Sequence, residues 1–243
     1  MHGAGLYHGA SPRRIVRAAP CATREGIPLV NKPLVIVGTG MQSEVVDYHF
    51  STEGRRTVAY VLDPEYIRED SFHGCPVLGF DEARRRFPPQ THDLFVSIGF
   101  TATAARKRWV LAAQAAGYVL PSFVHANASV AQNVRVGANT LIRDLAVVCP
   151  YVQLGDDIFI APHVCVGHHC RVGSHSFFAA GTVLAGGVEI GEGCFVGVNA
   201  CVRDRVRVGE GCIIGASALI MADCAPHGVY RAARSERVRD LKA

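Results

Sequence analysis

The sequence predicts a small parallel α/β domain followed by a parallel β-helix. Two observations predict this fold. Residues 33–120 alternate short β-branched apolar runs with helical stretches, which is typical of a parallel sheet with crossover helices. From Val124 to Ile220 every sixth residue is aliphatic or phenylalanine without a break, and a fixed period of this kind indicates a stacked repeat.

The α/β domain is expected to be a small Rossmann-like unit in which strands and helices alternate. Its first strand ends at Gly38 and its second at Asp63, and Gly117 closes the last helix. The predicted strands are 34–37, 58–62 and 94–98, and the predicted helices are about 42–52, 81–87 and 103–116.

Each six-residue unit of the repeat is expected to form one short strand and one turn. The aliphatic residue points inward and a small or β-branched residue four positions later fills the corner. Glycine, often directly after the aliphatic residue, or Asn/Asp allows the tight turn. Three units complete one triangular coil, so residues 18 apart stack in register. Some of the cysteines occupy the small inward position, where a thiol acts as a core hydrophobe: Cys170, Cys194, Cys212 and Cys224.

Composition excludes several classes of protein. The net charge of +4 is spread over scattered arginines, so no nucleic-acid partner is expected, and no apolar run is long enough for a membrane span. The 9 cysteines are odd in number and include no C-x-x-C pair, which favours free thiols in a reducing cytoplasm. No histidine–carboxylate cluster has metal-ligand spacing, so we expect no metal.

The chain is divided by these patterns into four parts. They are an irregular N-terminal extension (1–32), the α/β domain (33–120), the β-helix (121–225) and a C-terminal tail (226–243). The α/β domain placed before the six-residue repeat resembles the sugar acyltransferases of the hexapeptide-repeat family, typified by the bacillosamine-pathway N-acetyltransferases and the sialic acid O-acetyltransferases. The resemblance covers about residues 33–230.

This resemblance implies a fold, partners and a mechanism. The β-helix would wind left-handed and assemble as a homotrimer, with acetyl-CoA in the groove between neighbouring helices. The α/β domain would hold the nucleotide of a sugar nucleotide. A histidine on the β-helix would deprotonate the amine or hydroxyl of the sugar, which then attacks the thioester directly.

Two adjacent histidines are the catalytic candidates. His168 and His169 fall at an outward-facing turn of the repeat, and an imidazole titrates near neutral pH, which suits proton removal. The resemblance makes His168 the general base and places His169 where the family has an acidic residue that orients the base. If a carboxylate orients His168 instead of His169, the candidates are Asp144 and Asp204.

The thioester is expected to lie one coil above the base. Gly186 follows His168 by 18 residues and should therefore stack on it. The resemblance implies that backbone groups of Ala185, Gly186 and Gly187 receive the pantetheine and thioester of acetyl-CoA, because small residues allow a close approach.

Other residues are assigned to acetyl-CoA by the resemblance. Phe177 aligns with a histidine that contacts acetyl-CoA in some relatives, and His175 is not its equivalent. The family closes with a lysine that can meet the CoA phosphate, and Arg231 or Arg234 is expected to serve that phosphate here.

The acceptor is expected at the glycine-rich turn after the first strand. Gly38 and Gly40 present backbone N–H groups and a helix N-terminus to a phosphate or ribose. Met41 and Gln42 stand where the family commonly has Gly and His. Asp63, at the end of the second strand, is placed for a ribose or base contact, as in the family.

We therefore predict an acetyl-CoA-dependent N-acetyltransferase that acts on an amino group of a nucleotide-linked deoxysugar. The alternative is an O-acetyltransferase of a sugar hydroxyl, of the sialic-acid type, which would use the same His168. More distant alternatives are a non-catalytic binding module and a metal-dependent β-helix protein. The latter needs three converging histidines, and His163 belongs to another face than His168 and His169.

Overall fold

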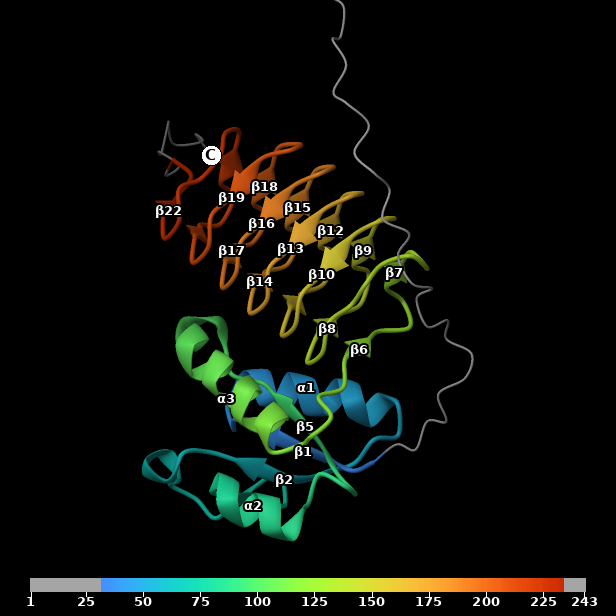
Figure 1. The fold of residues 1–243 in the computed structure, drawn as a ribbon, viewed down its shortest axis with the longest axis vertical. Coiled ribbons are helices and arrows are strands. Elements are labelled where there is room, and N and C mark those ends of the chain that lie inside the picture. Colours follow the sequence, from blue (N-terminus) through green and yellow to red (C-terminus); the bar gives the residue numbers. More distant parts are fainter. Residues whose placement is uncertain (1–31, 234–243) are drawn as a thin grey trace, which may run out of the picture.

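The computed structural model describes residues 32–233 as an α/β domain beside a β-helix (Figure 1). The predicted N-terminal extension, apart from its last residue, and the end of the predicted tail from Arg234 lie outside the described residues. No helix between residues 32 and 233 is both long and apolar enough to cross a bilayer.

The α/β domain is a five-stranded sheet with the order β3-β4-β2-β1-β5, parallel except for the β3–β4 pair. The sequence predicted the three central strands and the three helices to within about two residues, and missed the edge hairpin β3–β4. The elements are β1 (Leu34–Val37), α1 (Met41–Thr52), β2 (Thr57–Val61), η1 (Pro64–Tyr66), β3 (Ser71–Phe72), β4 (Cys75–Leu78), α2 (Phe80–Arg86), β5 (Asp93–Val96), η2 (Phe100–Ala102) and α3 (Thr103–Ala115).

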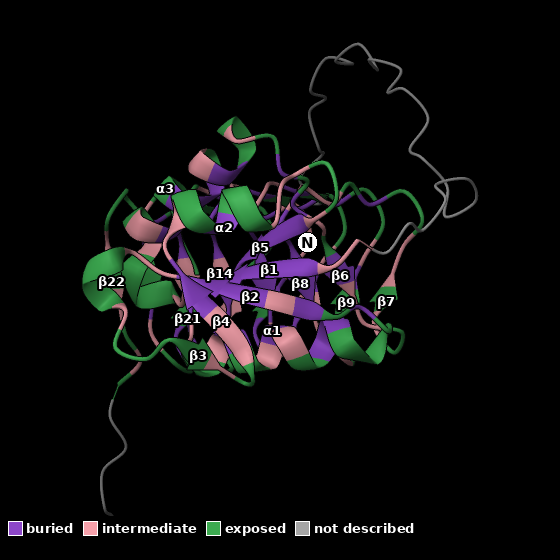
Figure 2. Cartoon of the chain, turned by 90° about the horizontal axis from the view of Figure 1, so that it is seen from below, coloured by how far each residue is buried: buried purple, intermediate pink, exposed green. Residues whose placement is uncertain are grey.

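Both faces of this sheet are covered, which explains why its central strands are apolar throughout. Val35 and Val37 pack on the side of α2 and α3, where Trp109 lies. Leu34 and Ile36 point to the opposite side, toward α1 and the first coils of the β-helix. The central strands are accordingly buried while the outer surfaces of the helices are exposed (Figure 2).

The second part is a left-handed parallel β-helix made of three sheets of two-residue strands. Strands pair with those one coil away, as Cys165 does with Val147 and Val183, which confirms the predicted 18-residue register. The docking face, which meets the α/β domain, contains β6 (Phe123–Val124), β8 (Leu141–Ile142), β11 (Phe159–Ile160), β14 (Phe177–Phe178), β17 (Phe195–Val196), β20 (Ile213–Ile214) and β22 (Val229–Tyr230).

The other two faces differ in the side chains that they present outward. The apolar face, with Val147, Val183 and Leu219 exposed, contains β7 (Ser129–Val130), β9 (Val147–Val148), β12 (Cys165–Val166), β15 (Val183–Leu184), β18 (Cys201–Val202) and β21 (Leu219–Ile220). The charged face contains β10 (Gln153–Leu154), β13 (Arg171–Val172), β16 (Glu189–Ile190) and β19 (Arg207–Val208), continued by single bridges at Arg135 and Cys224.

The turns of the β-helix require a left-handed residue at every sixth position. From Asn139 to Ser217 each residue in this phase has a φ between 54° and 71°. Glycine, Asn or Asp fills this position in about half of the turns, as expected, but the position lies two residues after the glycines that follow the aliphatic residue, so for those glycines the expectation was wrong. Those glycines have an ordinary φ and are needed for space instead: a Cβ at Gly167 would lie 2.7 Å from the carbonyl oxygen of Leu184 in the next coil.

A buried polar cluster joins the two parts. Arg106 of α3 donates from Nε to the carboxylate of Asp157 at 2.7 Å, and the same carboxylate bonds Nδ1 of His175 at 2.8 Å. Asn139, one coil before Asp157, donates to it at 2.8 Å and exchanges two hydrogen bonds with the backbone of Val96 in β5. Because every member is buried and bonded, the cluster fixes where the α/β domain sits on the β-helix.

Candidate active site

His168 lies at the corner where the apolar face turns into the charged face, between β12 and β13. Its side chain is exposed, and its ring lies against the backbone of Gly186 in the next coil. A Cβ at Gly186 would be 2.6 Å from both Cε1 and Nε2 of the imidazole. The carbonyl oxygen of His168 also accepts a hydrogen bond from the N–H of Gly187 at 2.8 Å. The structure thus brings His168 and Gly186 together as the register predicted.

His169 is the hydrogen-bonding partner of His168. The two Nδ1 atoms are 3.1 Å apart, and both side chains are exposed. His169 occupies the left-handed position of its turn, with φ of 60°. Its ring stacks on that of Tyr151, one coil earlier, with the ring centres 4.7 Å apart and the planes inclined by 27°.

The two carboxylates considered as orienting groups lie elsewhere. Asp204 is exposed in the same corner as His168, one coil beyond Gly186, and has no hydrogen bond or ion pair within residues 32–233. Asp144 lies at a different corner, beside His49 and His125, where these residues line a hollow of about 420 Å³ between α1 and the first coils. The imidazole of His169 is therefore the group that the chain itself places on Nδ1 of His168.

The backbone at the predicted thioester position offers one free donor. The N–H of Ala185 bonds the carbonyl of Val202, and the N–H of Gly187 bonds that of His168. The N–H of Gly186, between them, donates to no other residue in the part of the chain that the structure describes. Backbone N–H groups that point at a developing oxyanion stabilise acyl transfer, so this N–H is a candidate for that role.

The remaining residues assigned to acetyl-CoA are not next to His168 within one chain. Phe177 lies on the docking face, where its ring contacts Phe159 and Phe195 and the tip of the α/β domain at Phe100. Arg231 is exposed at the end of the β-helix, beside Gly215 on the corner between the docking and apolar faces. Arg234 lies outside the described residues. These three assignments stay predictions.

The glycine-rich turn has the backbone geometry of an anion site. Gly38 has φ of 114°, and a Cβ there would lie 2.8 Å from Oγ of Ser43. Ser43 stands where a third glycine would be, and its hydroxyl bonds that of Ser97 at 2.6 Å beneath the turn. Helix α1 begins after Gly40 with no side-chain cap, which leaves its first N–H groups open.

The other residues predicted to bind the acceptor are Met41 and Gln42, at the start of α1, and Asp63, just beyond β2. Met41 is 83% exposed and Gln42 is half-buried at the start of α1. Asp63 accepts two hydrogen bonds from the guanidinium of Arg108, and this bonding raises the pKa of Arg108. Beyond the ends of β1 and β2 lies a hollow of about 270 Å³, lined by Thr39, Leu62, Tyr66, Arg68, Glu69, Ser71, Phe72 and Val77. Asp63 is a chain neighbour of this hollow but does not line it.

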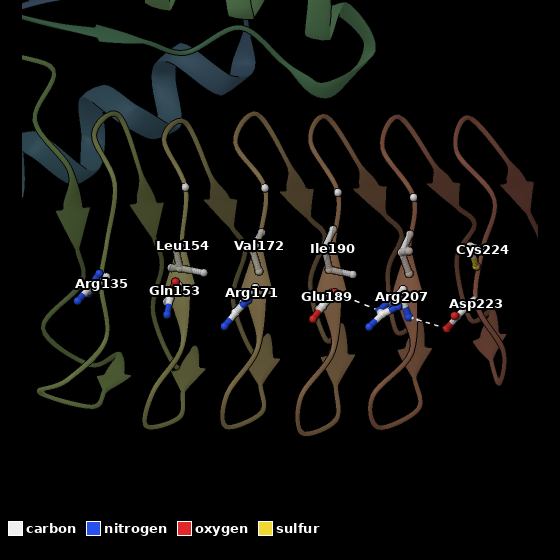
Figure 3. Close-up of a pocket in the computed structure, with 15 residues that line it drawn as sticks. Arg135, Gln153, Leu154, Arg171, Val172, Glu189, Ile190, Arg207, Asp223 and Cys224 are labelled. Carbon is white, nitrogen blue, oxygen red and sulfur yellow. Dashed lines mark hydrogen bonds and ion pairs between the residues drawn. The ribbon is translucent and has the colours of Figure 1, made fainter. Parts of the chain in front are cut away.

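A hollow of about 730 Å³ follows the charged face rather than the His168 corner (Figure 3). A row of Arg135, Gln153, Arg171, Glu189 and Arg207 runs along it from coil to coil. Arg207 pairs with Glu189 at 3.2 Å, whereas Arg135 and Arg171 form no ion pair with residues 32–233. His168 precedes Arg171 by only three residues in the chain but does not line the hollow.

Sequence reasoning missed two groups of residues. Tyr151 precedes His169 by 18 residues, so the register itself would have placed it against that histidine. The contact of Arg106 with Asp157 was missed because it crosses between the two parts of the chain, and no period links α3 to the β-helix; His175 follows Asp157 by 18 residues, so the register would have paired these two. Within the described residues, no group of three or more His, Cys, Asp or Glu side chains is arranged to hold a metal ion.

Comparisons with known proteins agree with this geometry. Residues 187–222 match the family model described as bacterial transferase hexapeptide (six repeats). The acetyltransferase domain of PglB from Neisseria gonorrhoeae FA1090 is 26% identical, with a TM-score of 0.74 over 83% of this chain and 97% of that one. PerB from Caulobacter crescentus, solved with CoA and GDP-perosamine, is 28% identical, with a TM-score of 0.74 over 87% of this chain and 97% of that one. The chain is an acyltransferase that is similar to these hexapeptide-repeat sugar acetyltransferases.

The similarity extends to the α/β domain, because the matched structures cover both parts of the chain. WeeI from Acinetobacter baumannii AYE shares the fold at 19% identity, with a TM-score of 0.66 over 81% of this chain and 95% of that one. No curated protein matches the chain by sequence.

Proposed function

We propose that the protein transfers the acetyl group of acetyl-CoA to an amino group of a nucleotide-linked deoxysugar. The observation that carries the proposal is the contact between His168 and Gly186, which puts a base and a free backbone N–H side by side at an open corner. The complex of PerB with CoA and GDP-perosamine supports the two substrate classes.

The proposed reaction needs one base and one oxyanion donor. Nε2 of His168 takes a proton from the amine as its nitrogen attacks the thioester carbon. The N–H of Gly186 bonds the oxyanion of the tetrahedral intermediate. The C–S bond then breaks, and the proton held by His168 passes to the leaving thiolate, so that amide and free CoA are formed. Positioning of the two substrates supplies much of the rate, and the reaction needs no change of oxidation state.

His169, the hydrogen-bonding partner of His168, favours an amine over a hydroxyl as the acceptor group. An imidazole at Nδ1 carries no negative charge in its neutral form and stabilises the imidazolium less than a carboxylate does. A neutral amine is already a good nucleophile, whereas a hydroxyl depends on strong general-base assistance. The presence of His169 in place of an acid therefore supports N-acetylation.

The nucleotide is proposed to bind in the α/β domain. The open N–H groups at Gly38–Gly40 and at the start of α1 suit its phosphates, and the hollow beside Thr39 suits its nucleoside. Met41 and Gln42 would border the sugar. Asp63 would contact the ligand only through the oxygen lone pairs that its hydrogen bonds to Arg108 leave free.

We also propose a homotrimer in the cytoplasm. The apolar face exposes Val147, Val183 and Leu219 in one strip, which a neighbouring copy would cover. The eight cysteines among residues 32–233 are all free thiols, which suits a reducing compartment. Light scattering of the protein and of Val183→Asp tests the assembly: the proposal expects a trimer that the charge dissociates, and a wild-type monomer contradicts it.

The function is tested by thiol release from acetyl-CoA with UDP-, dTDP-, GDP- and CMP-linked amino sugars. One acceptor should release thiol and gain the mass of one acetyl group. Alkaline hydroxylamine, applied to the purified product, then separates the linkages, because it cleaves an O-acetyl ester and leaves an N-acetyl amide intact. A labile product would assign the protein to O-acetylation instead, and no product with any nucleotide sugar would refute the acceptor class.

A further inference from the structure

The corner that holds His168 carries a run of three rings on two successive coils. Tyr151 stacks on His169, and His169 bonds His168. Tyr151 and His169 are both left-handed, with φ of 65° and 60°, and they are 18 residues apart in the register. The same backbone conformation repeated one coil later projects the two side chains in the same direction, which is why their rings stack.

The ring of His169 is further fixed by its backbone. Its N–H donates to the carbonyl of Pro150 at 3.1 Å, next to Tyr151 in the preceding coil. Tyr151 is 59% exposed, so its ring makes little contribution to the core of the β-helix and instead covers one face of the imidazole. Stacking of this kind restricts the side-chain rotation of an exposed residue.

The bond between the two Nδ1 atoms determines where the protons are. Only one of the two nitrogens can carry hydrogen, because two N–H groups cannot bond each other. If Nε2 of His168 is to accept a proton, Nδ1 of His168 must carry the hydrogen and donate it to Nδ1 of His169. His169 must then carry its own hydrogen on Nε2. Protonation of both rings would place two N–H groups face to face and break the bond.

We propose that Tyr151 and His169 form a positioning pair that holds His168 in the tautomer with a free Nε2. The proposal rests on His168 being the base of the proposed acetyl transfer. His169 acts through His168 and not on the substrate, and Tyr151 acts through His169. The nearest charged residues along the chain and in the same corner are Arg171, which follows His169 by two residues, and Arg203, Asp204 and Arg205 in the turn one coil beyond Gly186, where the side chain of Arg205 lies over Gly187.

Two pairs of variants separate stacking from hydrogen bonding. Tyr151→Phe keeps the stacked ring, and Tyr151→Leu removes it; leucine is tolerated at this backbone conformation, since Leu145 has φ of 58° in the same helix. His169→Phe keeps the stack but removes the hydrogen-bond acceptor, and His169→Asp restores an acceptor with a negative charge. Both substituted residues are exposed, so the melting temperatures of all four variants should stay close to that of the wild type.

The first readout is steady-state kinetics of acetyl transfer as a function of pH. Tyr151→Phe should match the wild type. Tyr151→Leu and His169→Phe should lower kcat by on the order of tenfold or more with little change in KM, because the base is misplaced while the substrates still bind. His169→Asp should retain activity and move the acid limb to higher pH, because the carboxylate stabilises the imidazolium. Unchanged kcat and pH profile in both Tyr151→Leu and His169→Phe would overturn the proposal.

The second readout does not depend on activity. Nitrogen NMR of the histidine-labelled protein at neutral pH should show His168 protonated at Nδ1 and His169 at Nε2. His168 should become a mixture of tautomers in His169→Phe. A wild-type His168 protonated at Nε2 would overturn the positioning role. If His168→Ala keeps full turnover while the NMR pattern is as expected, the proposed function fails and the ring arrangement stands, so the two failures are distinguishable.

Discussion

The imidazole of His168 fills the space into which a side chain at Gly186 would project. A Cβ on Gly186 would approach Cε1 and Nε2 to 2.6 Å, so a larger residue must push the ring away. We therefore expect Gly186→Ala to lower kcat by on the order of a hundredfold, as displacements of about 1 Å in a catalytic group do. Steady-state kinetics, with the melting temperature measured alongside, checks this prediction.

Gly99→Ala is the control for that variant. Gly99 has an ordinary φ of −67°, and nothing lies within 4 Å of a Cβ placed there. Its activity should equal that of the wild type. A fully active Gly186→Ala would contradict the claim that the position of the His168 ring limits kcat.

Removal of Arg106 should destabilise the protein strongly. Its guanidinium is 1% exposed and bonds Asp157 at 2.7 Å, so Arg106→Met leaves a buried carboxylate without its cation. A broken buried pair of this kind costs about 3–5 kcal/mol, measurable as the free energy of unfolding in urea. Lys107→Met is the matched control, because the Lys107–Glu192 pair is about half exposed and should cost less than about 1 kcal/mol. Equal losses in the two variants would contradict the role of the cluster.

Two thiols should resist labelling in the native protein. Burial raises the pKa of Cys170 and of Cys194 to about 11. At pH 8 only about one molecule in a thousand then carries the reactive thiolate, and the sulfur is also covered. Reaction with a disulfide reagent followed by mass spectrometry should leave both unlabelled until the protein is unfolded. Labelling of either one at the rate seen in the unfolded chain would contradict their place in the core.

Acidification should destabilise the contact between α1 and the β-helix. Burial lowers the pKa of His49 from its ordinary 6.5, and the charges of Arg143 and His125 lower it further. The unfolded chain therefore binds a proton more readily than the folded one, so stability falls as the pH drops below about 6.5. Protonation would also break the bond that Arg143 donates to Nε2 of His49 at 3.1 Å.

Urea unfolding at pH 7.5 and 5.5 measures this effect. The wild type should lose more stability between the two values than His49→Leu, which has nothing to protonate at that position. An equal loss in both proteins would place the acid sensitivity elsewhere.

The repeat was predictable from sequence because each strand of a β-helix pairs with the strands 18 residues before and after it. Val124 and its successors all face one core, so the period that fills the core also specifies the pairing of Cys165 with Val147 and Val183. The contact between His168 and Gly186 follows from the same register. The backbone conformation of the turns did not follow, because Leu145 and Arg205 adopt a left-handed φ that their residue types disfavour and that only the stacking of the coils imposes.

Contacts between the two parts of the chain were not predictable in this way. Arg106 read as one of several scattered arginines on a helix, and only the fold brings it to Asp157. The β3–β4 hairpin was missed because its strands are short and Pro76 interrupts the second. The residues that the family resemblance assigned to acetyl-CoA, such as Phe177 and Arg231, lie apart from His168 in a single chain, and their roles stay predictions.

The central claim is that His168 is the base of acetyl transfer to a nucleotide-linked amino sugar. The most direct test is the rate of thiol release from acetyl-CoA with the best acceptor, measured for His168→Ala and for His163→Ala. His163 is an exposed, left-handed turn residue like His169 but belongs to another corner, so it controls for loss of a surface histidine. We predict that His168→Ala loses at least about a hundredfold in kcat while His163→Ala keeps the wild-type rate. Full turnover in His168→Ala would contradict the mechanism.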